Sequence, residues 1–207
     1  MPRPRFDRLS PEKRERILEA AAKSFAASGY ENTSFNRILS EAGISKGAAY
    51  YYFDDKADLY VTTLRHYMGE LLAAIDFDPA RLTADNYWAE VAGLYRQQFT
   101  LYAQRPWVMG IARAAGAPLA MDGLAEGPLA EVWAAAMGLM AGLLQRGHEL
   151  GMVRSDLPAD LLRELLLAVD TAHDRWLLDR WATMAPEDLS AAAERIADTL
   201  RRLLSPA

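Results

Sequence analysis

The chain has 207 residues and no cysteine, and 51% of its residues are hydrophobic while 25% are charged. This length allows a sizeable core in one or two compact domains. The lack of cysteine excludes disulfides, thiolate nucleophiles and cysteine-ligated zinc. Charges, Gly or Pro interrupt every apolar segment, so we expect no transmembrane span. The basic start is not followed by an apolar stretch, which favours a cytoplasmic protein over a secreted one.

Charge is distributed unevenly along the chain. Residues 1–56 contain ten Lys/Arg and eight Asp/Glu, whereas residues 57–207 contain thirteen Lys/Arg and twenty Asp/Glu. An acidic body repels polyanions, so any nucleic acid would bind the basic first part. The six cations of the first sixteen residues could reach a minor groove or phosphates, or belong to a solvated tail; they are Arg3, Arg5, Arg8, Lys13, Arg14 and Arg16.

The first predicted helix begins near residue 10 and ends at Gly29. Ser10 can cap it, and Pro11 suits its first position. Ile17, Ala21 and Phe25 recur at helical spacing and predict an apolar stripe that packs on the following helices.

Residues 33–56 predict two short helices joined by a tight turn. Thr33 can cap the first helix, and Gly43 ends it because glycine readily adopts the left-handed conformation. Ser45 can cap the second helix, which contains Lys46 and three consecutive tyrosines before Phe53. This arrangement places a second helix in the major groove of DNA.

The second short helix has the side chains that such a role requires. Gly47 and Ala48 allow a close approach to base edges, and the hydroxyls of Tyr50, Tyr51 and Tyr52 can donate to phosphates. The alternative is that the tyrosines only pack against one another and the core.

Residues 16–60, RILEAAAKSFAASGYENTSFNRILSEAGISKGAAYYYFDDKADLY, closely resemble the TetR/AcrR family of bacterial transcriptional repressors. The resemblance implies a DNA-binding head at residues 1–56 and, at residues 57–207, a helical body that binds an inducer and dimerises through its last two helices. The residues expected to bind operator DNA are Thr33, Ser34, Asn36, Ser45, Lys46, Gly47, Ala48, Tyr50, Tyr51, Tyr52 and Lys56.

The rest of the chain also has helical periodicity, and no strand-like alternation occurs. We expect helices over residues 54–75, 82–104, 106–115, 128–150, 158–182 and 186–204, with a Gly- and Pro-rich loop at 116–128. The predicted fold is therefore all-α, with about nine helices.

All five tryptophans lie in the body. Two facing stripes of aromatic and Met side chains could enclose a pocket for a small organic ligand, although core packing is the alternative for each residue. The predicted lining is Trp88, Tyr95, Phe99, Tyr102, Trp107, Trp133, Met137 and Trp176. Because this lining is apolar and the body is acidic, we expect a neutral or cationic effector.

The last two helices have apolar faces that are too wide for one small bundle to bury. We therefore predict a homodimer with two-fold symmetry. Its interface is expected at Leu165, Leu166, Val169, Ile196, Leu200 and Leu203.

Catalytic patterns are missing from the sequence, and we expect no enzyme activity, cofactor or metal. Asp170, His173 and Asp174 share a helical face, but a paired histidine near a pocket or interface is favoured over a metal site. The sequence thus predicts a regulator, most simply a repressor that a hydrophobic or aromatic effector releases from a palindromic operator. The alternatives are a helical carrier or enzyme with a vestigial head, and a DNA binder without effector.

Overall fold

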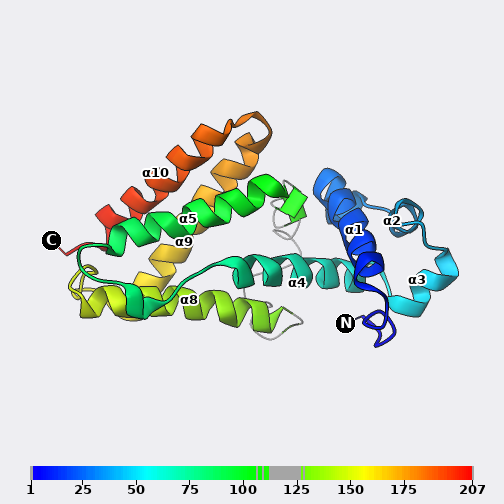
Figure 1. Cartoon of the computed structure of the whole chain (residues 1–207), viewed down its shortest axis with the longest axis horizontal. Coiled ribbons are helices and arrows are strands. Elements are labelled where there is room, and N and C mark those ends of the chain that lie inside the picture. Colours follow the sequence, from blue (N-terminus) through cyan, green and yellow to red (C-terminus); the bar gives the residue numbers. More distant parts are fainter. Residues whose placement is uncertain (1, 106, 109, 112–126, 128, 207) are drawn as a thin grey trace. The chain divides into compact units, whose positions relative to one another are not determined.

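The computed structural model describes residues 2–105, 107–108, 110–111, 127 and 129–206. These residues form eight α-helices and two short 3-10 helices, and none of them forms a strand (Figure 1). The predicted all-α fold is confirmed. None of the described helices combines the length and apolar character needed to cross a bilayer.

The chain divides into two compact units, of which the first comprises residues 1–70 and 105–133. It contains α1 (Pro11–Asn32), α2 (Phe35–Glu41), α3 (Lys46–Tyr52) and most of α4 (Lys56–Ala74). Its core consists of fully buried apolar side chains from all parts of this region, among them Ile17, Phe25, Ile38, Phe53 and Leu59. The stripe predicted on the first helix therefore packs as expected.

The second unit comprises residues 71–104 and 134–207. Its elements are η1 (Pro79–Arg81), α5 (Tyr87–Gln104), most of α8 (Ala130–Glu149), α9 (Ala159–Arg180), η2 (Trp181–Thr183) and α10 (Pro186–Leu204). The buried alanines Ala92 on α5 and Ala193 and Ala197 on α10 allow these two helices to pack along much of their length (Figure 1).

Local sequence features set most helix ends correctly. Ser10 accepts a hydrogen bond from the Lys13 backbone N–H, and Gly43 and Gly151 have the positive φ angles that end helices. Gly29, which was predicted to end the first helix, has a φ of 72° but only kinks α1, which continues to Asn32. One cap was predicted wrongly, because Ser34 caps α2 while Thr33 ends α1. The expected helix at 106–115 and loop at 116–128 lie mostly outside the described residues.

Candidate nucleic-acid interface

The turn between α2 and α3 is fixed by the backbone. Gly43 has a φ of 67°, and its N–H donates to the Ser40 carbonyl while the Ile44 N–H donates to the Leu39 carbonyl. This pair of hydrogen bonds is the Schellman arrangement, which requires a left-handed residue after the last helical turn. The Ser45 hydroxyl then accepts from the Ala48 N–H and caps α3 at 3.2 Å. The predicted helix-turn-helix is therefore formed.

One polar contact of Glu41 attaches α2 to α1, and a second lies within α2. Glu41 accepts from the Ser24 hydroxyl at 2.7 Å and from Arg37 Nε at 2.8 Å. These two hydrogen bonds lower the pKa of the Glu41 carboxyl, the Arg37 contribution being the larger. The Ser24 hydrogen bond and the buried side chains of Ile38 and Leu39 hold α2 against α1.

One face of α3 is open to solvent. A methyl group added at Gly47 would have no neighbour within 4 Å. Tyr50 and Tyr51 are 46% and 47% exposed, which is unusual for side chains of this size. Tyr50 keeps an edge-to-face contact with Phe35 of α2 at 5.7 Å between ring centroids. The phenols are thus oriented by the head and still accessible to a partner.

The other residues predicted to contact DNA have varied positions. Ser34, Asn36 and Ser45 are exposed near the two helix N-termini, and Ala48 is partly buried. Lys46 opens α3. Tyr52 packs edge-to-face on Phe6 with a centroid distance of 6.3 Å.

Two of the predicted DNA contacts, Thr33 and Lys56, have structural roles within the head. Thr33 is buried, and its hydroxyl is placed to donate to the Gly29 carbonyl at 2.6 Å or the Ser24 carbonyl at 3.1 Å. The Lys56 ammonium donates to the carbonyls of Tyr30, Glu31 and Thr33 at 2.9 to 3.3 Å, where it satisfies the C-terminal end of α1. The polar groups of both side chains are therefore engaged within the head.

The basic N-terminal segment folds onto the head. Arg3 donates its backbone N–H to the Tyr52 carbonyl and pairs with Asp54 at 2.7 Å. Phe6 is 3% exposed and packs on Phe53 at 4.8 Å between centroids. The Arg5 guanidinium consequently lies 4.1 Å above the ring of Tyr51. Arg5 was predicted only as one of six cations that could reach a minor groove or phosphates, and the list of expected operator contacts did not include it.

Comparison with known proteins agrees with this geometry. A model for bacterial regulatory proteins of the tetR family matches residues 17–62. The HTH-type transcriptional repressor Rv1474c of Mycobacterium tuberculosis is 25% identical over 206 residues, which cover 98% of this chain and 100% of that protein. A crystal structure of a TetR family transcriptional regulator from Chloroflexus aurantiacus has 26% identity and a TM-score of 0.68, covering 99% of this chain and 98% of the other.

The helix-turn-helix region of this chain is that of the TetR family.

A further solved transcriptional regulator shares the fold over most of the chain. FadR from Bacillus subtilis, solved in complex with stearoyl-CoA, has a TM-score of 0.73 at 20% identity, covering 89% of this chain and 96% of that one. Such low identity shows the fold alone. The chemistry of the second unit therefore follows from its own side chains.

An aromatic and polar cluster lies between α5 and α9 in the second unit. Phe99 stacks on His173 with nearly parallel rings 5.9 Å apart, and Tyr95 lies against Phe99. The Tyr95 hydroxyl donates to Asp170 at 2.5 Å, and the Tyr102 hydroxyl accepts from Gln98 at 2.7 Å. Four of the eight residues predicted to bind an effector, Tyr95, Phe99, Tyr102 and Trp176, lie in or beside this cluster.

The electrostatics of this cluster disfavour negative charge. Desolvation raises the pKa of Asp170 to about 6, and desolvation together with Asp170 raises the pKa of Asp174 to about 7. Asp174 has no hydrogen bond or ion pair within the described part of the chain. Burial lowers the pKa of His173, and the Ala192 backbone opposes part of this shift. Neither ring nitrogen of His173 has a hydrogen-bond partner among the described residues.

The remaining predicted pocket residues are not all found in this cluster. Trp88 is partly buried, and its indole N–H has no hydrogen-bond partner among the described residues. Met137 on α8 is partly buried. Trp107 and Trp133 belong to the first unit, where Trp107 packs edge-to-face on Tyr67 at 4.5 Å.

The residues predicted at a dimer interface divide into two groups. Leu166, Ile196 and Leu200 are at most 2% exposed and belong to the core that α5, α9 and α10 share within one chain. They are not on the surface, which corrects their predicted place on a free apolar face. The others are partly buried: Leu165, Val169 and Leu203. Another apolar stripe on α9 is largely uncovered. Leu161, Ala168, Ala172 and Trp176 in it are exposed, and Leu165 is partly buried.

Proposed function

We propose that this protein is a TetR family transcriptional repressor that binds operator DNA through α3 and leaves it when an effector binds the second unit. The open face of α3, with Gly47 uncovered and Tyr50 and Tyr51 exposed, carries the proposal. Hydroxyls and a guanidinium at such a helix contact phosphates, while a small residue permits a close approach to base edges. The protein acts in the cytoplasm, and catalysis forms no part of this proposal.

The DNA-binding surface can be tested even though the operator sequence is not known. Operator fragments are selected from random duplexes with the full chain, and affinity is then measured by fluorescence anisotropy over a range of salt concentrations. Tyr50→Ala, Lys46→Ala and Arg5→Ala should each weaken binding at least tenfold, and the loss of one phosphate contact should reduce the salt slope by about one.

A matched control is available on α10. Arg202→Ala removes one cation from an exposed pair with Asp198, so the net charge changes as it does in Lys46→Ala. This variant should keep its affinity for the operator. Unchanged affinity in all three head variants would show that α3 is not the contact surface.

We infer that the effector binds beside the cluster of Tyr95, Phe99, Asp170, His173 and Asp174, and that it is neutral or cationic. Two partly buried carboxyls with raised pKa values disfavour an anionic group next to them, whereas a cation would stabilise their charged forms. FadR was solved with stearoyl-CoA, an anionic ligand. The polar cluster of this chain supports a different effector chemistry.

Tryptophan fluorescence can separate these ligand classes. Neutral aromatic, cationic aromatic and acyl-CoA compounds are titrated into the wild type and into Asp174→Asn. We expect Asp174→Asn to lower the affinity for cationic ligands and to leave the affinity for neutral ligands unchanged. Preferential binding of acyl-CoA by the wild type would refute this effector class. An effector that binds the chain but never changes its operator affinity would refute the regulatory mechanism.

We further propose a homodimer whose two protomers contact each other through the uncovered stripe on α9. Leu161 and Trp176 are 43% and 37% exposed, and exposed apolar side chains on one helix face favour pairing with a second copy. Leu161→Glu should give monomers in sedimentation at micromolar concentration, with the helical content retained. Ile196→Glu should instead unfold the chain, because Ile196 is buried in one protomer. A wild type that sediments as one chain would contradict the dimer.

A further inference from the structure

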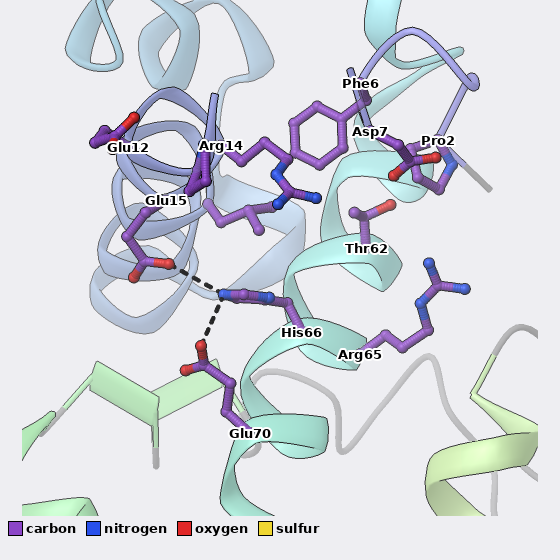
Figure 2. A pocket seen from close by; sticks show the side chains of 12 residues that line it. Pro2, Phe6, Asp7, Glu12, Arg14, Glu15, Thr62, Arg65, His66 and Glu70 are labelled. Atoms are coloured by element: carbon purple, nitrogen blue, oxygen red, sulfur yellow. Dashed lines mark hydrogen bonds and ion pairs between the residues drawn. The ribbon is translucent and has the colours of Figure 1, made fainter. Parts of the chain in front are cut away.

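A second polar site lies in the first unit, between α1 and α4, away from the open face of α3. Glu15 of α1 meets His66 and Glu70, which are one helical turn apart on α4. These side chains line one side of a cavity of about 660 Å³ that Arg14 and Arg65 also border (Figure 2). The proposed DNA binding assigns no role to this site.

The donor atoms of the three side chains converge on one point. His66 Nε2 lies 3.0 Å from Glu15 Oε2 and 3.4 Å from Glu70 Oε1. Dashed lines in Figure 2 mark these two interactions. One atom from each of the three residues lies within 4.8 Å of the other two. With bonds of about 2.1 Å, two ligands of one Zn²⁺ ion are about 3.0 Å apart at a right angle and about 3.4 Å apart at the tetrahedral angle. The two spacings around His66 agree with these values.

The outer oxygen of each carboxylate is already bound by a second donor. The Tyr67 hydroxyl donates to Glu15 Oε1 at 3.0 Å, and Arg105 Nη1 donates to Glu70 Oε2 at 2.5 Å. Each glutamate therefore turns its other oxygen toward His66. Metal sites commonly use such outer hydrogen bonds to orient their ligands.

We propose that Glu15, His66 and Glu70 bind one divalent transition-metal ion, of which Zn²⁺ is the representative. Imidazole nitrogen favours first-row transition ions over Mg²⁺ and Ca²⁺, and carboxylates complete the ligand set. The three ligands are 32% to 44% exposed, so an ion can enter from solvent, and the cavity has room for water at the remaining coordination position. The bound ion joins α1 to α4. This inference does not depend on the effector or the operator.

Metal binding is tested on the full chain after treatment with EDTA and removal of the chelator. Isothermal titration calorimetry should show one Zn²⁺ ion bound per chain. Competition with a chromophoric chelator measures the affinity. His66→Gln and Glu15→Gln should each weaken binding at least tenfold. Tyr67→Phe keeps the buried ring and removes one outer hydrogen bond, so it should weaken binding by about tenfold.

Controls distinguish the site from other histidines and from a simple ion-pair cluster. His148→Gln removes an exposed imidazole on α8 and should leave Zn²⁺ affinity unchanged. Zn²⁺ should raise the thermal midpoint of the wild type and not that of His66→Gln, whose fold is checked by circular dichroism without metal. Loss of Zn²⁺ binding in His148→Gln, unchanged binding in both ligand variants, equal affinity for Mg²⁺, or no binding at all would overturn the proposal. In the last case the cluster is an ion-pair network only.

Discussion

Replacing Asp174 by asparagine should stabilise this protein, and the gain should depend on pH. The ordinary pKa of 3.8 is raised to about 7 in the folded chain by desolvation and by Asp170. Between these values the folded state holds a proton that the unfolded state has lost, so the free energy of unfolding falls as the pH rises through this window. The difference between the two pKa values corresponds to about 4 kcal/mol at pH 8, as an upper limit.

Asparagine keeps the size of the side chain and removes the charge. Because Asp174 is only partly buried, solvent screens part of its charge, and we expect Asp174→Asn to gain about 1 to 2 kcal/mol at pH 8. At pH 5 the folded carboxyl is mostly protonated, so the gain should fall to less than half of that. Urea unfolding followed by circular dichroism at both pH values measures the difference.

Asp179→Asn is the matched control, because Asp179 is exposed on the same helix. It should change the free energy of unfolding by less than about 0.5 kcal/mol. A destabilised Asp174→Asn protein at pH 8, or an equal gain at both pH values, would refute the view of Asp174 as an unpaired and desolvated charge.

Three further substitutions test features of the fold. Lys56→Met keeps the aliphatic stem but leaves three carbonyls at the end of α1 without their donor. It should lower the free energy of unfolding, measured by chemical denaturation, by about 1 to 3 kcal/mol, while the folded protein keeps its operator affinity. Gly43→Ala places a side chain at a φ of 67° and should cost about 1 to 2 kcal/mol, measured in the same way, with weaker DNA binding as α3 shifts. Gly147→Ala would place a methyl group against the Tyr87 hydroxyl and Val153, and calorimetry should show a loss of about 1 to 3 kcal/mol.

Features encoded within a few residues were predictable from the sequence. The turn at Gly43 and the cap at Ser45 depend on local backbone geometry, and the structure contains both. The choice between Thr33 and Ser34 as the cap of α2 could not be predicted, because the Thr33 hydroxyl is buried against carbonyls of α1. Adjacent residues with similar side chains can exchange roles through such tertiary contacts.

Contacts between distant segments could not be predicted. Glu15 and His66 are 51 positions apart, so no spacing rule connects them. Asp170 and His173 were considered as metal ligands because they lie one helical turn apart in the sequence. Periodicity also finds an apolar face without telling which surface covers it. Ile196 and Leu200 were predicted to face a partner, but they are buried in the core formed with α5 and α9 of the same chain.

The folded N-terminal segment has a practical consequence for how this protein is produced. Phe6 completes the aromatic core around Phe53, and the Arg3 backbone is hydrogen-bonded at the end of α3. An affinity tag fused ahead of Pro2 would emerge beside the helix that is proposed to read DNA, and cleavage after Phe6 would remove part of the core. A tag at the C-terminus, beyond α10, leaves this segment unaltered and is the better choice for binding studies.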